Sequence, residues 1–345
     1  ALSALCFHGS LAQNISKSDR IIDSNWEFQS ESEMKSRPAI VPGCVHLDLL
    51  NNKVIADPYF ENNEKKQHWI ELENWEYNST FVLSSKEYEK EHIELQFEGL
   101  DTRAKVYLND SLVIEADNMF RTWIASVKST LKVGKNKLKV CFYSPINTYA
   151  EKVHNYPYEL PAGCENVEVK VSPFIRKAAY HFGWDWGPRF VTCGIWRPVH
   201  LISWNECRIN TIQCQTIDQT EFGAKVKVSI EIESTSVNGD VDLYINQHSR
   251  RVHLKKGHIT IIDTLHYRAE EFWWPNGSGK QTLQNINIEI RKEHITIDSR
   301  KIKFGVRTVE LIQEKDSIGT SFYFKVNGIS TFMKGANYIP QDLFL

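Results

Sequence analysis

An aspartate between two tryptophans, Trp184-Asp185-Trp186, has the residue types that best fit a binding site in this sequence. Glycines flank the triplet and a proline follows, so the backbone can turn where bulkier residues could not. The indole rings offer apolar faces to a sugar ring, and Asp185 offers two acceptor oxygens to a pair of vicinal hydroxyls. An ordinary loop is the alternative, in which Asp185 accepts hydrogen bonds from backbone amides and the rings fill core. Composition alone slightly favours that alternative.

Charge is nearly balanced along the 345 residues, with 41 Lys and Arg against 43 Asp and Glu. The balance gives no electrostatic reason to bind nucleic acid or an anionic membrane, and no apolar run is long enough to span a bilayer. We therefore expect neither partner. A neutral partner such as a sugar suits a chain that holds 10 Trp, although most of these should lie in core. The sequence does not indicate an oligomeric state.

Cysteine and histidine spacing does not predict a metal site. The chain has 7 Cys, but no CxxC pair and no Cys/His cluster with zinc-ligand spacing. Cys207 and Cys214 could meet across a hairpin, yet a chain of this size does not need disulfides, and we expect buried free thiols. His181 lies near Asp185 in sequence, where we expect it to form a hydrogen bond rather than to bind a metal.

Residues 1–13 resemble the end of a signal peptide. A short apolar run precedes Ser10-Leu11-Ala12, a small-x-small triplet typical of cleavage after Ala12. We therefore expect a secreted or periplasmic protein, or one of the lysosomal lumen if the source is eukaryotic. A cytoplasmic protein with an apolar N-terminal tail is the alternative.

The dominant hydrophobic period is two, which predicts strands with one buried and one wet face. Apolar residues alternate with polar ones at 226–232, 286–290 and 93–97, and turn residues separate such runs. The pattern predicts a mainly β fold made of β-sandwiches. One short helix is expected after Gly43, with Val45, Leu47, Leu49 and Leu50 on one face. Residues 86–92 form a charge run that we interpret as a solvated loop.

Three segments follow from the pattern. Residues 14–204 have strands interrupted by long aromatic loops, as in a jelly roll. Residues 205–310 alternate regularly over a length that suits one immunoglobulin-like sandwich. The pattern changes at residues 311–345, where two further strands are expected before the sequence stops in the middle of an element. We therefore expect the natural polypeptide to be longer.

The stretch from Trp184 to Pro188 resembles the Trp-Asp-Trp-Gly-Pro signature of the β-mannosidases of glycoside hydrolase family 2. Other stretches resemble motifs of the same family in the same order: 41–46, 98–102, 106–109, 117–120, 194–199, 273–277, 304–310 and 334–340. Tyr338 departs from the pattern, because many family members have Trp there. Each motif alone is of moderate specificity, but the ordered set is highly specific.

The resemblance implies a jelly roll, an immunoglobulin-like sandwich and, at 311–345, the first strands of a truncated (β/α)8 barrel. It implies a retaining exo-hydrolase that releases terminal non-reducing β-D-mannose from β-mannosides, with no cofactor. Two Glu on the barrel perform that chemistry in the family, and both lie far beyond the first barrel strand. No catalytic residue is therefore expected in this chain, which should be inactive alone.

The resemblance also implies which residues hold the sugar. Asp185 would bind hydroxyls of the terminal mannose with Trp184 and Trp186 beside it, Arg176 would support the loop, and Asn337 would line the pocket at the end of the first barrel strand. Two alternatives stay open. One is another family 2 exo-glycosidase, an exo-β-glucosaminidase or a β-galactosidase, which a substrate panel would distinguish. The other is a non-catalytic carbohydrate-binding module, which would not need the barrel-like residues after Leu311.

Overall fold

The computed structural model describes residues 17–163, 165–235 and 239–344. The chain folds as two compact units. The first comprises Ser18–Ser203 with residues 339–344, and the second comprises Lys17 with Trp204–Tyr338. The expected signal-peptide remnant, residues 1–13, lies outside the described residues.

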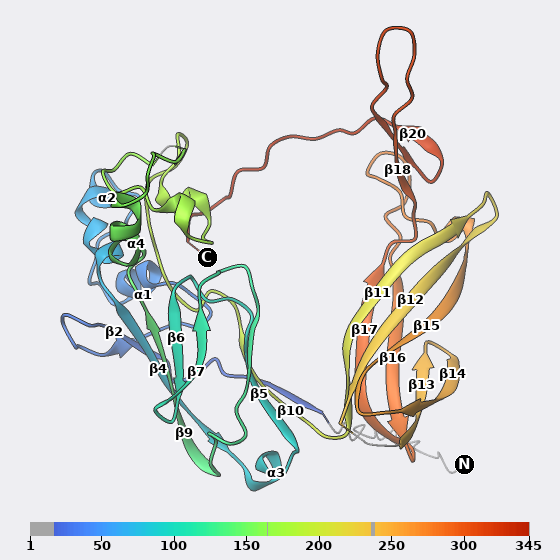
Figure 1. Ribbon diagram of the computed structural model, residues 1–345, viewed down its shortest axis with the longest axis horizontal. Coiled ribbons are helices and arrows are strands. Elements are labelled where there is room, and N and C mark those ends of the chain that lie inside the picture. Colours follow the sequence, from blue (N-terminus) through green and yellow to red (C-terminus); the bar gives the residue numbers. More distant parts are fainter. Residues whose placement is uncertain (1–16, 164, 236–238, 345) are drawn as a thin grey trace, which may run out of the picture. The chain divides into compact units, whose positions relative to one another are not determined.

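The first unit is built from two antiparallel sheets. The larger has the order β3 (Arg37–Pro38), β2 (Glu27–Ser30), β4 (Trp75–Leu83), β9 (Gly134–Phe142), β6 (Ala104–Leu108) and β7 (Ser111–Ala116). The smaller has the order β1 (Ser18–Ile21), β10 (Val199–Trp204), β5 (His92–Phe97) and β8 (Trp123–Ser126). The longest strands of the larger sheet lie side by side in Figure 1.

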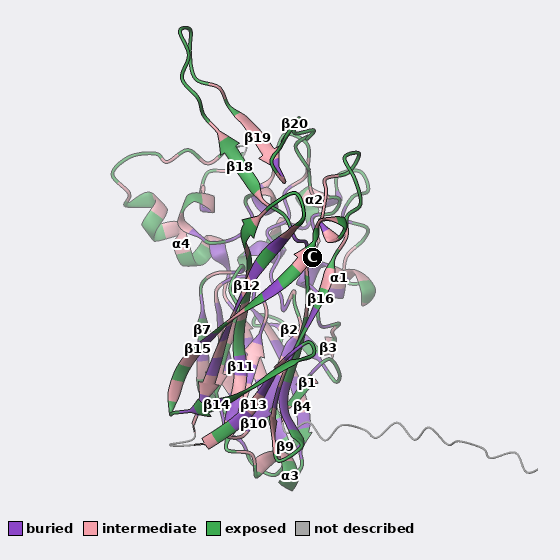
Figure 2. Ribbon diagram, turned by 90° about the vertical axis from the view of Figure 1, so that its right-hand side faces the viewer, coloured by how far each residue is buried: buried purple, intermediate pink, exposed green. Residues whose placement is uncertain are grey.

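Alternating side chains make these two sheets a sandwich. In β5, Ile93, Leu95 and Phe97 are buried while the residues between them are partly exposed. In β4, Trp75 and Tyr77 point to the same hydrophobic cluster as the β5 residues, so the two sheets share one core. The buried residues of these strands are coloured purple in Figure 2. The predicted period of two is confirmed here.

Short helices gather at one end of this sandwich. α1 (Val45–Asn51), α2 (Asn63–Lys66) and α4 (Pro145–His154) lie near that end, and α3 (Ser85–Tyr88) lies near the opposite one (Figure 1). The 3-10 turns η1 (His68–Leu72), η2 (Ser172–Phe174) and η3 (Ala179–Phe182) complete the unit.

Two local expectations for this unit need correction. The helix expected after Gly43 is α1, but it buries His46 and Asp48 while Leu47 and Leu50 are only partly buried. The charge run at 86–92 is not a loop throughout, because it includes most of α3. Ser84 caps that helix, accepting a hydrogen bond from the Glu87 amide while the Glu87 carboxylate accepts one from the Ser84 amide.

The second unit contains another sandwich. One sheet has the order β11 (Cys207–Gln219), β12 (Gly223–Ser234) and β15 (Gly257–Arg268), and the other has the order β14 (His248–Leu254), β13 (Gly239–Ile245), β16 (Gln284–Lys292) and β17 (Ile295–Phe304). The turn η4 (Ala269–Glu271) follows β15. Val226, Val228 and Ile230 are completely buried, as their alternation predicted. The mainly β sandwich class predicted from the sequence is confirmed.

Cys207 and Cys214 lie on the same strand, β11, so they cannot meet across a hairpin. Both are free thiols, and so are the other three cysteines among the described residues, but Cys214 and Cys141 are only partly buried, whereas buried thiols were expected.

A small antiparallel sheet follows the second sandwich, with the order β18 (Val309–Ile312), β19 (Tyr323–Val326) and β20 (Ile329–Thr331). Most of its residues are exposed or only partly buried (Figure 2). No strand follows Thr331 among the described residues up to 344. The assignment of residues 311–345 to the beginning of a barrel stays a prediction, as does the division into domains. None of the helices described is long and apolar enough to cross a membrane.

Candidate functional site

The Trp-Asp-Trp stretch forms a tight backbone turn. The Trp184 amide donates to the Gly187 carbonyl at 3.1 Å, and the Gly187 amide donates to the Trp184 carbonyl at 3.3 Å. Asp185 and Trp186 therefore occupy the tip of a two-residue loop. Gly183 enters the turn with a φ of 92°, a conformation that glycine adopts without strain. The local sequence thus explains why the chain turns here.

The turn exposes the side chains expected to bind sugar. Trp184 and Trp186 are 40% and 38% exposed, with ring centroids 6.5 Å apart. Trp186 also lies 6.4 Å from the Tyr180 ring. Within the described part of the chain, the Asp185 carboxylate has no hydrogen bond or ion pair. The rings do not fill core, and Asp185 does not accept hydrogen bonds from backbone amides, so the ordinary-loop alternative does not describe this turn.

A pocket of about 660 Å³ lies beside the turn, within the size range of small-molecule sites. Trp184 and Asp185 form part of its wall, and Trp186 does not line it. The other side chains around it are mostly charged or polar and come from α2, η1, the 163–170 loop and the residue after Pro188: Glu64, Lys65, His68, Glu165, Asn166, Lys170 and Arg189. The turn therefore combines an apolar ring face, a polar cavity and a carboxylate that has no partner among the residues described.

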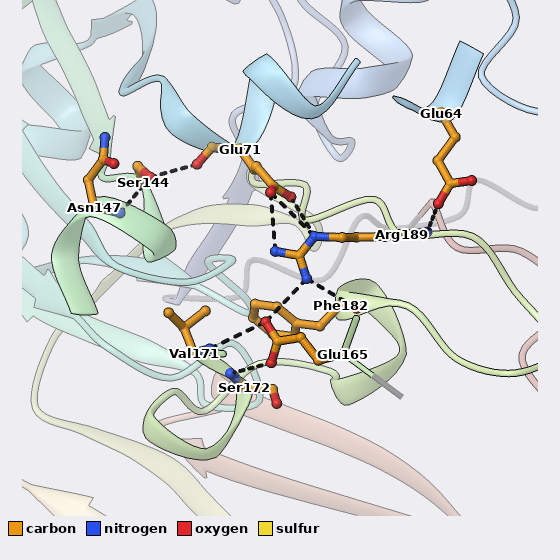
Figure 3. A network of polar contacts seen from close by, with 9 residues as sticks. All are labelled: Glu64, Glu71, Ser144, Asn147, Glu165, Val171, Ser172, Phe182 and Arg189. Carbon is orange, nitrogen blue, oxygen red and sulfur yellow. Dashed lines mark hydrogen bonds and ion pairs between the residues drawn. The ribbon is translucent and has the colours of Figure 1, made fainter. Parts of the chain in front are cut away.

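Arg189 holds a buried network behind the turn (Figure 3). Its guanidinium donates to both oxygens of Glu71, with Nε–Oε2 and Nη2–Oε1 distances of 3.1 Å. Its Nη1 donates to Glu165 Oε1 at 3.2 Å and to the Phe182 carbonyl at 3.1 Å. The Arg189 amide donates to Glu64 Oε1 at 2.7 Å. Burial raises the pKa of Glu71, and the charge of Arg189 opposes that rise.

The returning segment 339–344 packs below the turn within the first unit. The Tyr59 hydroxyl donates to Asp342 Oδ1 at 2.8 Å, and the Phe344 ring lies 5.3 Å from His46 and 5.1 Å from Phe190. Leu343 is 4% exposed, and its side chain lies close to the Gly187 backbone. This segment therefore forms part of the base on which the turn rests.

His181 connects that segment to a buried ion pair. Its Nε2 lies 2.9 Å from the Leu343 carbonyl, and its Nδ1 lies 3.8 Å from Asp101 Oδ2. Asp101 pairs with the buried Lys177. Burial first, and then the charge of Lys177, hold the pKa of His181 well below its usual value. The ring is therefore neutral, and Nε2 carries the proton because a carbonyl can only accept.

Comparisons with known proteins show which family has this architecture. Residues 26–197 match the family described as glycosyl hydrolase 2 galactose-binding domain-like. A β-mannosidase of Bos taurus is 36% identical over 340 residues, covering 93% of this chain and 38% of that protein. The chain belongs to glycoside hydrolase family 2.

Solved structures of two glycosidases share the fold. The crystal structure of a β-D-mannosidase from Dictyoglomus thermophilum matches with a TM-score of 0.88 and 38% identity, covering 95% of this chain and 41% of that one. The exo-chitosanase of Amycolatopsis orientalis matches with a TM-score of 0.71 over 94% of this chain and 37% of that one, but at 18% identity it shows the fold alone. The chain spans about two fifths of the length of the curated β-mannosidases it matches.

The structure of this family 2 chain brings three predicted site residues together, since Trp184, Asp185 and Trp186 share one turn. Arg176 is exposed and does not line the pocket, while its carbonyl accepts a hydrogen bond from the Met119 amide at 3.0 Å. Asn337 belongs to the second unit, where it is exposed in irregular backbone after β20. The roles of Arg176 and Asn337 in sugar binding stay predictions.

Sequence reasoning missed the residues that support the turn. Arg189 is the only charged residue in the run Gly187–Trp196. A single charge among uncharged residues is a local signal that the side chain pairs with a buried acid. Glu71 and Glu165 gave no such signal, because they are distant in sequence and neither belongs to a motif of the family.

Proposed function

We propose that this chain is the N-terminal part of a retaining, exo-acting β-mannosidase that releases terminal non-reducing β-D-mannose from β-mannoside glycans. The observation that carries the proposal is the exposed turn in which Asp185 has no partner among the described residues and stands between two half-exposed indole rings. The β-mannosidases named above support it, because they are similar over nearly all of this chain.

The turn has the groups needed to hold one sugar ring. An ionised carboxylate accepts charge-assisted hydrogen bonds from two neighbouring hydroxyls, which are stronger than bonds between neutral groups. The Trp184 ring offers its apolar face to the C–H groups of the sugar beside that carboxylate. In this proposal the nucleophile and the acid/base are two carboxyl groups that lie beyond residue 345 and are about 5–5.5 Å apart, as retaining chemistry requires.

Export belongs to the proposal as well. It rests on residues 1–13 alone, which lie outside the described residues. Secretion, a periplasmic location or a lysosomal lumen would each bring the enzyme to glycans.

Asp185→Ala in the full-length protein tests the proposed function. The variant should lower kcat/KM for an aryl β-mannoside by about a hundredfold or more, because it removes charge-assisted hydrogen bonds worth about 1.5–3 kcal/mol each. The turnover number kcat should fall along with the affinity, since these contacts tighten as the ring distorts towards the transition state.

The matched control is Asp218→Ala, which removes an exposed carboxylate paired with Lys225 at 3.0 Å on the second sandwich. It should leave both constants unchanged. The wild type should be assayed on aryl β-galactosides and β-glucosaminides in parallel. Preference for either of these, or unaltered kinetics in Asp185→Ala, would reject the proposal.

A further inference from the structure

We propose that Arg189 is a positioning residue for sugar binding, which fixes the Trp184–Gly187 turn so that Asp185 meets the hydroxyls in one geometry. This inference rests on the proposed function for its kinetic consequence, although the positioning itself is a property of the fold.

Arg189 closes the turn from both sides. Phe182 precedes the turn and Arg189 follows it, and the guanidinium donates to the Phe182 carbonyl at 3.1 Å. The Arg189 guanidinium also lies over the Phe182 ring, 5.6 Å from its centroid. Both stems of the turn are therefore held by one side chain, in addition to the backbone pair between Trp184 and Gly187.

The other ends of the network are anchored in the body of the sandwich (Figure 3). Glu71 lies in η1, and the Ser144 hydroxyl at the N-cap of α4 donates to the Glu71 carbonyl at 2.6 Å. Glu165 is held by the amides of Val171 and Ser172, at 3.3 and 3.1 Å. Through Glu71 and Glu165, the Arg189 side chain thus connects the turn to two separate segments of the first unit.

The geometry requires a guanidinium. Its planar fork satisfies Glu71 through two nitrogens while a third nitrogen reaches Glu165 and Phe182, and the round ammonium of lysine cannot make all of these bonds. Arg189 is 6% exposed and both carboxylates are buried, so its loss would leave two buried acids without their cation. Acid–acid repulsion would then push η1 and the 165–172 segment apart beneath the turn.

Arg189 acts through Asp185 in this inference. Its hydrogen bonds are directed to protein groups, whereas Asp185 at the tip has none among the described residues. Displacing a positioned group by about 1 Å can reduce a rate a hundredfold. A looser turn should therefore weaken sugar binding and turnover even though Arg189 itself touches no reacting atom.

A double-mutant cycle on the full-length protein tests this. Arg189→Gln should lower kcat/KM for the β-mannoside about tenfold or more in the wild-type background, but less than about threefold in the Asp185→Ala background, because the two residues act as one unit. Arg189→Lys should recover part of the loss. If Arg189→Gln lowers kcat/KM by the same factor in both backgrounds, Arg189 stabilises the fold without positioning Asp185, and the inference is overturned.

Hydrogen–deuterium exchange gives a readout that does not depend on activity. Arg189→Gln should speed exchange in residues 178–190, while Arg208→Gln, which breaks a similar pair with Glu233 in the second sandwich, should leave that segment unchanged. Unaltered exchange around the turn in a folded Arg189→Gln would also overturn the inference. If the wild type hydrolyses no β-mannoside, the proposed function fails, and the exchange result still decides whether Arg189 holds the turn.

Discussion

Asp48 is a carboxylate buried in the hydrophobic core of the first unit. It lies in α1 and is 1% exposed, yet its two oxygens each accept a hydrogen bond, from the Ile40 amide at 2.8 Å and from the Tyr77 hydroxyl at 2.7 Å. Burial raises the pKa of Asp48 to about 6, while the hydrogen bonds from the Ile40 amide and the Tyr77 hydroxyl oppose the rise.

Asp48→Asn should therefore change the pH dependence of stability. The folded pKa of Asp48 is about 6, against a value of about 4 in the unfolded chain, so its contribution to stability is fully present below pH 4 and is lost as the pH rises through 6. The asparagine variant stays uncharged, so it should match the wild type near pH 4 and exceed its free energy of unfolding by up to about 3 kcal/mol above pH 6.

Urea unfolding of both proteins between pH 4 and 8 measures this difference. Tyr77→Phe provides a second test, because it removes a hydrogen bond that lowers the pKa of Asp48. In this variant the fall in the free energy of unfolding should therefore extend to higher pH. If the free energies of unfolding of wild type and Asp48→Asn differ by the same amount across this pH range, the raised pKa of Asp48 is contradicted.

The residues predicted at the site and those missed differ in how far their partners lie along the chain. The Trp184–Gly187 turn follows from neighbouring glycines and could be predicted. The pairing of Arg189 with Glu71 joins residues 118 positions apart, and no local pattern specifies which acid a given arginine meets. Sequence reasoning therefore found the exposed residues of the turn and missed the buried residues that hold it.

At the scale of elements, the strands were predictable because burial on one face gives a period of two. β12 follows that rule along its whole length, and β16 follows it from Asn285 to Arg291. The α3 helix was missed because it spans a single turn, Ser85–Tyr88, which has no apolar stripe. Its formation depends on the capping interaction of Ser84 with Glu87.

Gly194 marks a close approach between two segments of the first unit. It forms an isolated bridge with Asp101, with both N–O distances 3.0 Å. A Cβ at this position would lie 2.5 Å from the Gly43 carbonyl oxygen and 2.8 Å from the Cys44 Cα, and both of these are backbone atoms. Glycine is therefore required at position 194 because a side chain there would collide with the backbone of Gly43 and Cys44.

Gly194→Ala should destabilise the first unit by about 2–4 kcal/mol, because the backbone near Gly43 must move to admit the methyl group. Gly319→Ala is the matched control, since a Cβ there would meet nothing within 4 Å. Denaturant unfolding measures both. A loss in Gly194→Ala no larger than in the control would show that the two segments can separate at little cost.

At the scale of the molecule, the described chain has two main hydrophobic cores that share no residue. Leu95 belongs to the first and Ile230 to the second, and both are completely buried. Separate cores are the condition under which two units unfold separately.

Leu95→Ala and Ile230→Ala should each destabilise only one unit, by about 2–5 kcal/mol. Hydrogen exchange at low denaturant can follow peptides of each unit in the same sample. Leu95→Ala should speed exchange in β4 and β9 but not in β12, and Ile230→Ala should do the reverse. Joint loss of protection in both units would mean that they unfold as one.

The return of residues 339–344 to the first unit has a consequence for folding during synthesis. The ribosome has completed every strand of the first sandwich by the time it has made β10, but the residues that cover Phe190 and Tyr59 emerge only after the whole of Trp204–Tyr338. Because domains fold as they leave the ribosome, Phe190 and Tyr59 lack their contacts with Phe344 while the unit that follows is translated. Of these two units, the first to begin folding is therefore the second to be completed.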